Sequence, residues 1–163
     1  MKENEYRIEW ISYCYNELSA VERELTNEAK KYAGSAYAPY SKFKVGAALR
    51  LASGIVVGGS NQENAAFPSG MCAERVAIFS AATQCPNDAP VQMAIVALAN
   101  GMITDMPVSP CGGCRQVFVE MEQRYGSPVE LLLCGSDEVI KITSSLLMPM
   151  AFTMIKKTAN KIC

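Results

Sequence analysis

The chain is organised around two short stretches, Cys72-Ala73-Glu74 and Pro110-Cys111-Gly112-Gly113-Cys114. Two thiols separated by two residues, joined by a third thiol from elsewhere in the chain, suit a tetrahedral zinc ion whose fourth position stays open. Glu74 lies two residues from Cys72, where a carboxylate can transfer the protons of a water molecule at that open position. Together the two stretches predict the site of a zinc hydrolase.

Both stretches are expected to lie where a loop enters a helix. Helix N-termini carry unsatisfied N–H groups and a partial positive charge, which favour a thiolate over a thiol. This matters because three thiolates over-neutralise a zinc ion. We therefore predict that Arg75, next to Glu74 in the sequence, donates hydrogen bonds to a ligand sulfur. The alternatives are that Arg75 is a solvated helix residue and that Glu74 only favours the helix dipole.

The composition restricts the chemistry further. The chain has 163 residues, half of them apolar, which fits one domain with a hydrophobic core. Its formal net charge of -1 gives no sign of a basic surface for nucleic acid. It contains no histidine, so zinc must be held by Cys, Asp or Glu, and Ser-His and Cys-His nucleophiles are excluded. A charged N-terminus without an apolar segment behind it, and no apolar run long enough for a bilayer, favour the cytoplasm and no membrane partner.

The alternative for the cysteines is a structural four-cysteine zinc site, with Cys85, Cys134 or Cys14 as the fourth ligand. Structural sites usually take their ligands as two close pairs, and Cys72 has no near partner in the sequence. Cys14 and Cys134 fit apolar patterns and are expected in the core. Cys163 is a terminal thiol without an assigned role.

Hydrophobic periodicity predicts an alternation of helices and strands after an initial helix. The expected helices cover residues 5–33, 72–83, 111–125 and, briefly, 144–150; the expected strands cover 43–51, 55–59, 91–99, 131–133 and 139–143. This order predicts an α/β fold, a three-layer α-β-α domain around one mixed, mostly five-stranded sheet. We expect a single domain over residues 1–163, with 1–17 as an N-terminal helical extension and 153–163 as a C-terminal tail.

At this point the sequence resembles a known family. Cys72-Ala73-Glu74-Arg75, together with Pro110-Cys111-Gly112-Gly113-Cys114-Arg115-Gln116, resembles the signature of the zinc-dependent deaminases. Three further stretches, within residues 36–49, 61–65 and 146–152, narrow the resemblance to the cytidine deaminases that act on free nucleosides, of the small homotetrameric three-cysteine type. The resemblance covers residues 21–152.

The resemblance implies a cytidine-deaminase-like fold and a set of roles at the metal. Cys72, Cys111 and Cys114 would bind one Zn²⁺ per subunit. Glu74 would carry protons during the attack on C4 of the pyrimidine, and the backbone around Ala73 would hold the amide edge of the base.

It also implies substrate contacts. Phe43 would pack on the base, and Asn61 and Glu63 would hydrogen-bond the ribose hydroxyl. Phe152 would reach into the site of a neighbouring subunit, and Phe67 would contribute across the same interface. In isolation, Phe43 fits a plain core residue of a strand, and Asn61 and Glu63 fit ordinary loop residues.

The sequence departs from the family pattern at two places. The family usually shows a glycine before the Ala-Phe pair near the C-terminus, where this chain has Met150. The first sixteen or so residues also extend beyond the family's usual start.

The resemblance implies hydrolytic deamination of cytidine and deoxycytidine to the uridines, with release of ammonia, as part of pyrimidine salvage. A deaminase of another cytosine-containing compound, such as blasticidin S, is the enzymatic alternative, and Asn61 and Glu63 argue against it. Polynucleotide editing is disfavoured by the net charge. A non-catalytic structural zinc protein is the alternative of a different class, disfavoured by the unpaired Cys72 and by Glu74.

Overall fold

The computed structural model describes residues 1–154. One sheet of seven strands forms the middle layer, in the order β1-β7-β6-β4-β2-β3, with β5 paired to β4. The strands are β1 (Ile11–Cys14), β2 (Phe43–Leu51), β3 (Val56–Ser60), β4 (Pro90–Ala99), β5 (Met102–Ile103), β6 (Glu130–Cys134) and β7 (Glu138–Thr143). The helices are α1 (Ala20–Gly34), α2 (Ala73–Gln84) and α3 (Gly112–Tyr125), with 3-10 turns η1 (Tyr15–Glu17), η2 (Phe67–Ser69) and η3 (Ser144–Leu147).

The sheet is mixed, as expected. β4 and β6 are parallel, and the other paired strands are antiparallel. The parallel pair requires a crossover, which α3 supplies between β4 and β6. The five expected strands are all present, and the count of five is corrected to seven because β1 and β5 were not foreseen.

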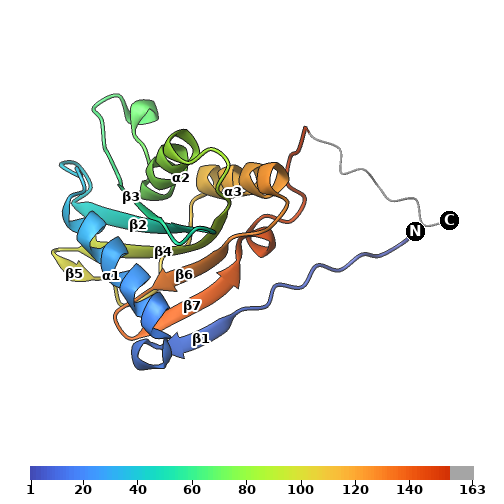
Figure 1. Cartoon of the computed structure of the whole chain (residues 1–163), viewed down its shortest axis with the longest axis horizontal. Helices are drawn as coiled ribbons and strands as arrows, with labels where there is room; N and C mark the ends of the chain where they lie inside the picture. Colours follow the sequence, from blue (N-terminus) through green and yellow to red (C-terminus); the bar gives the residue numbers. More distant parts are fainter. Residues whose placement is uncertain (155–163) are drawn as a thin grey trace.

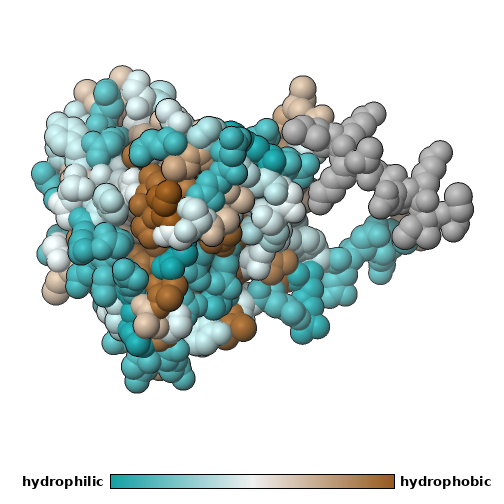
Figure 2. All heavy atoms as spheres, in the orientation of Figure 1, coloured by the Kyte–Doolittle hydropathy of each residue, from teal (hydrophilic) through white to brown (hydrophobic). Residues whose placement is uncertain are grey.

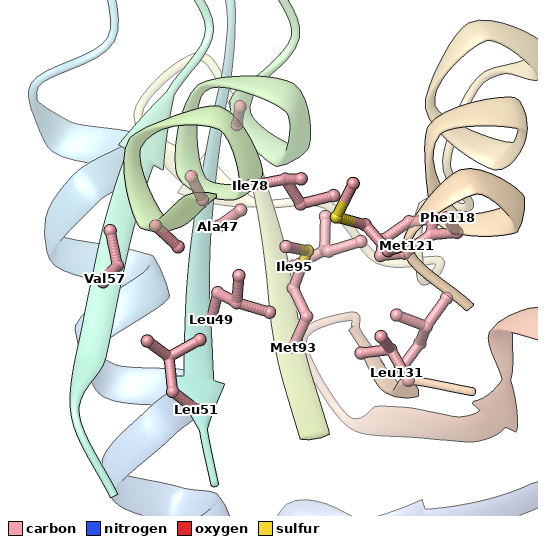
Figure 3. Close-up of a cluster of buried hydrophobic side chains, with 14 of the residues drawn as sticks. Ala47, Leu49, Leu51, Val57, Ile78, Met93, Ile95, Phe118, Met121 and Leu131 are labelled. Atoms are coloured by element: carbon pink, nitrogen blue, oxygen red, sulfur yellow. The ribbon is translucent and has the colours of Figure 1, made fainter. Parts of the chain in front are cut away.

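Helices cover both faces of the sheet, with α1 on one side and α2 and α3 on the other (Figure 1). Alternate residues of β2 divide the core between these layers. Ala47 and Leu49 pack on the α2 and α3 side in the cluster drawn in Figure 3, while Ala48 packs on the α1 side with Leu25 and Ala29. Both faces of the middle of β2 are therefore buried.

The first part of the chain differs from the prediction. The expected helix over residues 5–33 begins only at Ala20, because the Ser19 side chain accepts a hydrogen bond from the Glu22 N–H and the Glu22 carboxylate bonds back to the Ser19 N–H. The expected helical extension over 1–17 is instead an extended segment, a strand and a 3-10 turn. β1 pairs with β7 from Ile11–Lys141 to Cys14–Glu138, so pairing with the open sheet edge overrides the helical spacing of this segment.

The start of the chain extends away from the body of the domain (Figure 1). Residues 1–10 have no regular structure, and Figure 2 shows the start of the chain leaving the body as a narrow, largely hydrophilic tail. Most of the predicted C-terminal tail, including Cys163, lies outside the described residues. Within residues 1–154, none of the helices is both long enough and apolar enough to cross a membrane.

Two glycines let the outer layers approach the sheet. A Cβ on Gly46 would lie 2.1 Å from the Ala29 carbonyl oxygen of α1, and a Cβ on Gly59 would lie 2.5 Å from both the Ala73 carbonyl oxygen and the Ala77 nitrogen of α2. Because backbone atoms cannot move aside easily, only glycine allows this close packing. Gly59 thereby fixes the first turn of α2, where the site begins.

Candidate metal centre and substrate cleft

Three cysteines meet where two helices begin. Cys72 is the N-cap of α2, Cys111 is the N-cap of α3, and Cys114 lies in the first turn of α3. Their sulfur atoms all lie within 4.8 Å of one another, with 3.7 Å between Cys72 and Cys111 and 3.6 Å between Cys111 and Cys114. The structure therefore brings together the three predicted ligands, although Cys72 and Cys111 are 39 positions apart in the sequence.

The donor set fits zinc. Thiolates bound tetrahedrally at about 2.3 Å from a common ion lie about 3.8 Å from each other, close to the observed separations of 3.7 and 3.6 Å. Cys114 is buried, Cys72 is half-buried and Cys111 is exposed, so the cluster opens toward solvent on one side. Such a set would hold the ion by three protein ligands and would leave a place for a fourth, as in catalytic zinc sites.

The electrostatics of the cluster favour a bound cation. Hydrogen bonds from Cys114 and Arg75 lower the pKa of the Cys72 thiol to about 5. The contact with Cys72 raises the pKa of Cys114, and burial and the nearby Glu74 raise that pKa further. Several thiolates in one place repel each other, so all three lose their protons only when a cation shares their charge.

Arg75 lies beside the cluster. Its Nη2 donates a hydrogen bond to Cys72 Sγ at 3.7 Å. This contact raises the pKa of Arg75, because the guanidinium is stabilised by the thiolate. The charge of Arg75 offsets part of the negative charge that three thiolates carry.

Glu74 is buried in the first turn of α2, with 5% of its surface exposed. Burial raises the pKa of its carboxyl group, and the charge of Cys72 adds to that rise. A carboxyl group that accepts and releases protons near neutral pH needs such a raised pKa. The position and the environment of Glu74 both suit a proton carrier.

A cleft of roughly 300 Å³ adjoins the cluster. Its lining includes Cys72, Arg75, Asn61, Glu63 and Phe67. The structure thus gathers predicted metal, ribose and interface residues around one opening.

Asn61 and Glu63 also hold the fold together. The Asn61 side chain accepts a hydrogen bond from the Val45 N–H at 2.7 Å and donates one to the Phe43 carbonyl at 3.0 Å. Glu63 Oε2 accepts hydrogen bonds from the N–H groups of Tyr40 and Ser41, at 2.9 and 3.3 Å. Each side chain keeps further hydrogen-bonding capacity for a ligand.

The remaining predicted substrate residues take different positions. Ala73 is fully buried at the start of α2 beside the cluster. Phe43 is half-buried at the start of β2 and is not in the cleft lining, although its carbonyl bonds to Asn61. Phe67 and Phe152 are exposed by 75% and 68%, and the ring of Phe67 contacts Tyr40 edge to face at 5.9 Å between ring centres.

Two residues that follow Cys114 contribute contacts that sequence reasoning did not assign. Arg115 Nη1 donates a hydrogen bond to the Leu147 carbonyl at 3.1 Å, and its Nε donates one to the Pro110 carbonyl at 2.8 Å. Gln116 Nε2 donates one to the Phe152 carbonyl at 2.9 Å. The sequence places both residues directly after a predicted ligand, but their partners Leu147 and Phe152 lie more than thirty residues away.

The other described cysteines lie apart from the cluster. Cys134 is buried as expected, and burial raises the pKa of its thiol to about 11. Cys14 is exposed in β1, which corrects the expectation that it belongs to the core, because β1 lies at the edge of the sheet. Among residues 1–154, the only group of three or more potential ligands is Cys72, Cys111 and Cys114, so the structural four-cysteine site gains no support.

Three clustered thiols and a buried glutamate on an α-β-α scaffold define a metal-dependent hydrolase. A family model described as "Cytidine and deoxycytidylate deaminase zinc-binding region" matches residues 19–125. The chain therefore belongs to the cytidine and deoxycytidylate deaminase family, as the sequence motifs predicted.

Individual relatives agree with this assignment. The chain is 39% identical to a cytidine deaminase of Halalkalibacterium halodurans over 139 residues, covering 79% of this chain and 92% of the relative. It is 40% identical to a cytidine deaminase of Sporosarcina psychrophila over 130 residues, covering 80% and 90%. The crystal structure of cytidine deaminase from Burkholderia pseudomallei matches with a TM-score of 0.67 and 36% identity, covering 79% of this chain and 97% of the other.

Proposed function

We propose that this protein deaminates cytidine and deoxycytidine hydrolytically to uridine and deoxyuridine, with release of ammonia. One observation carries the proposal: three thiols cluster at two helix N-termini, and the buried Glu74 lies two residues after Cys72, in the first turn of α2. The relatives described as cytidine deaminases supply the substrate class.

Each residue has a defined task in this proposal. Cys72, Cys111 and Cys114 hold one zinc ion, and Arg75 offsets their charge. A zinc ion bound there would activate a water molecule by lowering its pKa. Glu74 accepts a proton from the attacking water and passes it to the pyrimidine ring, and the C4 amino group leaves as ammonia after a further proton transfer.

We propose that Asn61 and Glu63 bind the ribose hydroxyl, that Phe43 packs on the base, and that the backbone at Ala73 binds its amide edge. The cleft lining supports the first pair, and the resemblance supports the others. Buried or bonded polar partners reject a ligand that lacks the hydroxyl they bind, which would disfavour free cytosine.

We further propose a cytoplasmic homotetramer in pyrimidine salvage, as the resemblance implies. Phe67 and Phe152 support a shared site, because both rings are largely exposed in the single chain. Sedimentation analysis would test the assembly.

The first experiment measures ammonia release by the purified, zinc-loaded protein with cytidine, deoxycytidine, cytosine or blasticidin S. Turnover of both nucleosides with little on cytosine is the expected result. Turnover of blasticidin S alone would favour the alternative deaminase. Inactivity on all four, with stoichiometric zinc bound, would instead favour a structural zinc protein.

Glu63→Gln tests the ribose contact. Glutamine keeps an acceptor for the N–H groups of Tyr40 and Ser41, so the loop is retained while the carboxylate is lost. We expect KM for cytidine to rise about tenfold, as for loss of a charged hydrogen bond. Asn61→Ala is a poorer test, because that side chain bonds to the backbone of β2 and its removal would disturb the fold.

A further inference from the structure

The N-terminal segment (residues 6–14) lies before the part of the chain that matches the family, which starts at residue 19. It is attached to the domain through β1, whose four residues pair with β7. Ile8, Trp10 and Ile11 line a groove of roughly 650 Å³ together with Ile142 and Leu146. About half of each of the side chains of Tyr6, Ile8 and Trp10 is covered, with exposures of 51%, 43% and 57%.

The same segment reaches the turn that follows β7. The Tyr6 hydroxyl donates a hydrogen bond to the Ser145 carbonyl at 3.2 Å. Ser145 lies in η3, which opens the C-terminal strap (residues 144–152). The N-terminal segment therefore contacts the strap directly, although the two are separated by 139 positions in the sequence.

The strap is bonded on its other side to the helix that carries two metal ligands. Arg115 bonds to the Leu147 carbonyl and Gln116 bonds to the Phe152 carbonyl. Both donors directly follow Cys114. The start of the strap is fixed as well, because the Ser144 hydroxyl contacts Glu122 of α3 and accepts a hydrogen bond from the Val129 N–H.

We propose that the N-terminal segment positions the C-terminal strap, and through it Phe152, for nucleoside binding. Tyr6 is the positioning residue: it fixes the Ser145 backbone from the sheet-edge side while Arg115 and Gln116 hold the strap from the α3 side. Loss of the Tyr6 contact leaves the strap bonded only to α3 and to Val129, so its backbone samples more positions. The catalytic part of this inference rests on the proposed function, whereas the contact itself does not.

The test compares full-length Tyr6→Phe and Tyr6→Ala/Ile8→Ala with a matched control, Tyr15→Phe. Tyr15 also donates a single hydroxyl hydrogen bond, to Asn27 Oδ1 at 2.9 Å, but on α1 and away from the strap. Hydrogen exchange of the amides in residues 145–152 is measured by mass spectrometry, together with kcat and KM for cytidine and the zinc content.

In both Tyr6 variants we expect amide exchange in residues 145–152 to be about two- to tenfold faster, as for the loss of a modest hydrogen bond. KM for cytidine should rise by a similar factor, with kcat within about twofold and zinc unchanged, and Tyr15→Phe should match the wild type.

Unchanged exchange in the double variant would overturn the contact. Faster exchange with an unchanged KM would overturn the positioning role. If the wild type does not deaminate cytidine, the proposed function fails, and the exchange data still decide whether the segment holds the strap.

Discussion

The reactivity of Cys72, Cys111 and Cys114 depends on where their backbone lies. Cys72 and Cys111 are the N-caps of α2 and α3, and Cys114 lies in the first turn of α3. Hydrogen bonds from Cys114 and Arg75 lower the pKa of Cys72. Burial acts in the opposite direction on Glu74, whose pKa is raised. The N-terminal end of α2 thus places a thiol with a lowered pKa, Cys72, two residues from a carboxyl group with a raised pKa, Glu74.

Glu74→Gln should retain zinc and lose activity. The amide cannot accept the proton of the attacking water, so kcat for cytidine should fall by at least about 10²-fold, the usual contribution of a general acid–base group. Zinc content by atomic absorption should equal that of the wild type. Glu120→Gln, an exposed position on α3, is the control, and near-normal turnover of Glu74→Gln would remove Glu74 from the mechanism.

Met150 occupies a left-handed backbone conformation, with φ of 58°, at the position where the family usually has glycine. For a residue with a side chain, this conformation is unfavourable by about 1–2 kcal/mol. Glycine avoids this strain, but its greater freedom in the unfolded chain cancels part of the gain in stability. Met150→Gly should therefore stabilise the strap by about 0.5–1 kcal/mol, measured as slower amide exchange in residues 145–152. Met148→Gly is the matched comparison: its φ is −141°, so glycine relieves nothing there and the strap should exchange faster.

At the scale of elements, the site depends on the angle at which α2 and α3 meet the sheet. α2 is fixed against β3 by the contact between Gly59 and the backbone of Ala73 and Ala77. α3 ends at Gly126, which takes the left-handed conformation (φ 75°) common at helix C-termini. Small shifts of either helix would separate sulfur atoms that now lie less than 4 Å apart.

Gly59→Ala should disturb the metal centre from a distance. The new Cβ would lie 2.5 Å from two backbone atoms of α2, so the helix must move. We expect a loss of about 1–3 kcal/mol in the free energy of unfolding, as for other overpacked sites, and weaker zinc binding in competition with a chelator. Gly34→Ala is the control, because a Cβ there meets nothing within 4 Å. Equal behaviour of the two variants would contradict the role of Gly59.

At the scale of the whole molecule, an ion pair joins the α1 layer to strand β7 of the sheet. Lys141 of β7 lies 2.5 Å from Glu22 of α1 and 3.5 Å from Glu130 of β6. Burial disfavours the Glu22 carboxylate, but hydrogen bonds from Lys141 and Ser19 outweigh it and lower the pKa of Glu22 to about 2. The hydrogen bond with Glu22 raises the pKa of Lys141.

These shifts predict a pH dependence of stability. Because the pKa of Glu22 is lower in the folded state, its contribution is fully present above about pH 4.5 and is lost as the pH falls toward 2. Glu22→Gln, which keeps the capping interaction with Ser19, should therefore be less stable than the wild type at pH 6 and should lose less stability between pH 4.5 and 2.5. Urea unfolding at these pH values measures the difference, with the exposed Glu24→Gln as control. Parallel acid profiles for Glu22→Gln and the wild type would contradict the role of this pair.

The sequence by itself predicted Cys72, Cys111 and Cys114 as one cluster, Glu74 beside it, and the main order of helices and strands. These signals are local: the spacing of Cys111 and Cys114, the Cys72-Ala73-Glu74 stretch, and the periodicity of 43–51 or 91–99 all lie within a few turns of the chain. The fold class followed from them, because alternating strands and helices have few ways to bury their apolar faces.

Only the tertiary structure decided the rest. Residues 11–14 form a strand because β7 offers an open edge, and the paired residues are 124 to 130 positions apart. No local pattern reveals such a partner. The same holds for Asn61, whose amide is bound to the backbone of β2, and for Tyr6, Arg115 and Gln116, whose partners lie in the strap. A local pattern reports what a residue prefers, whereas a contact between distant segments exists only once the sheet and its layers have brought them together.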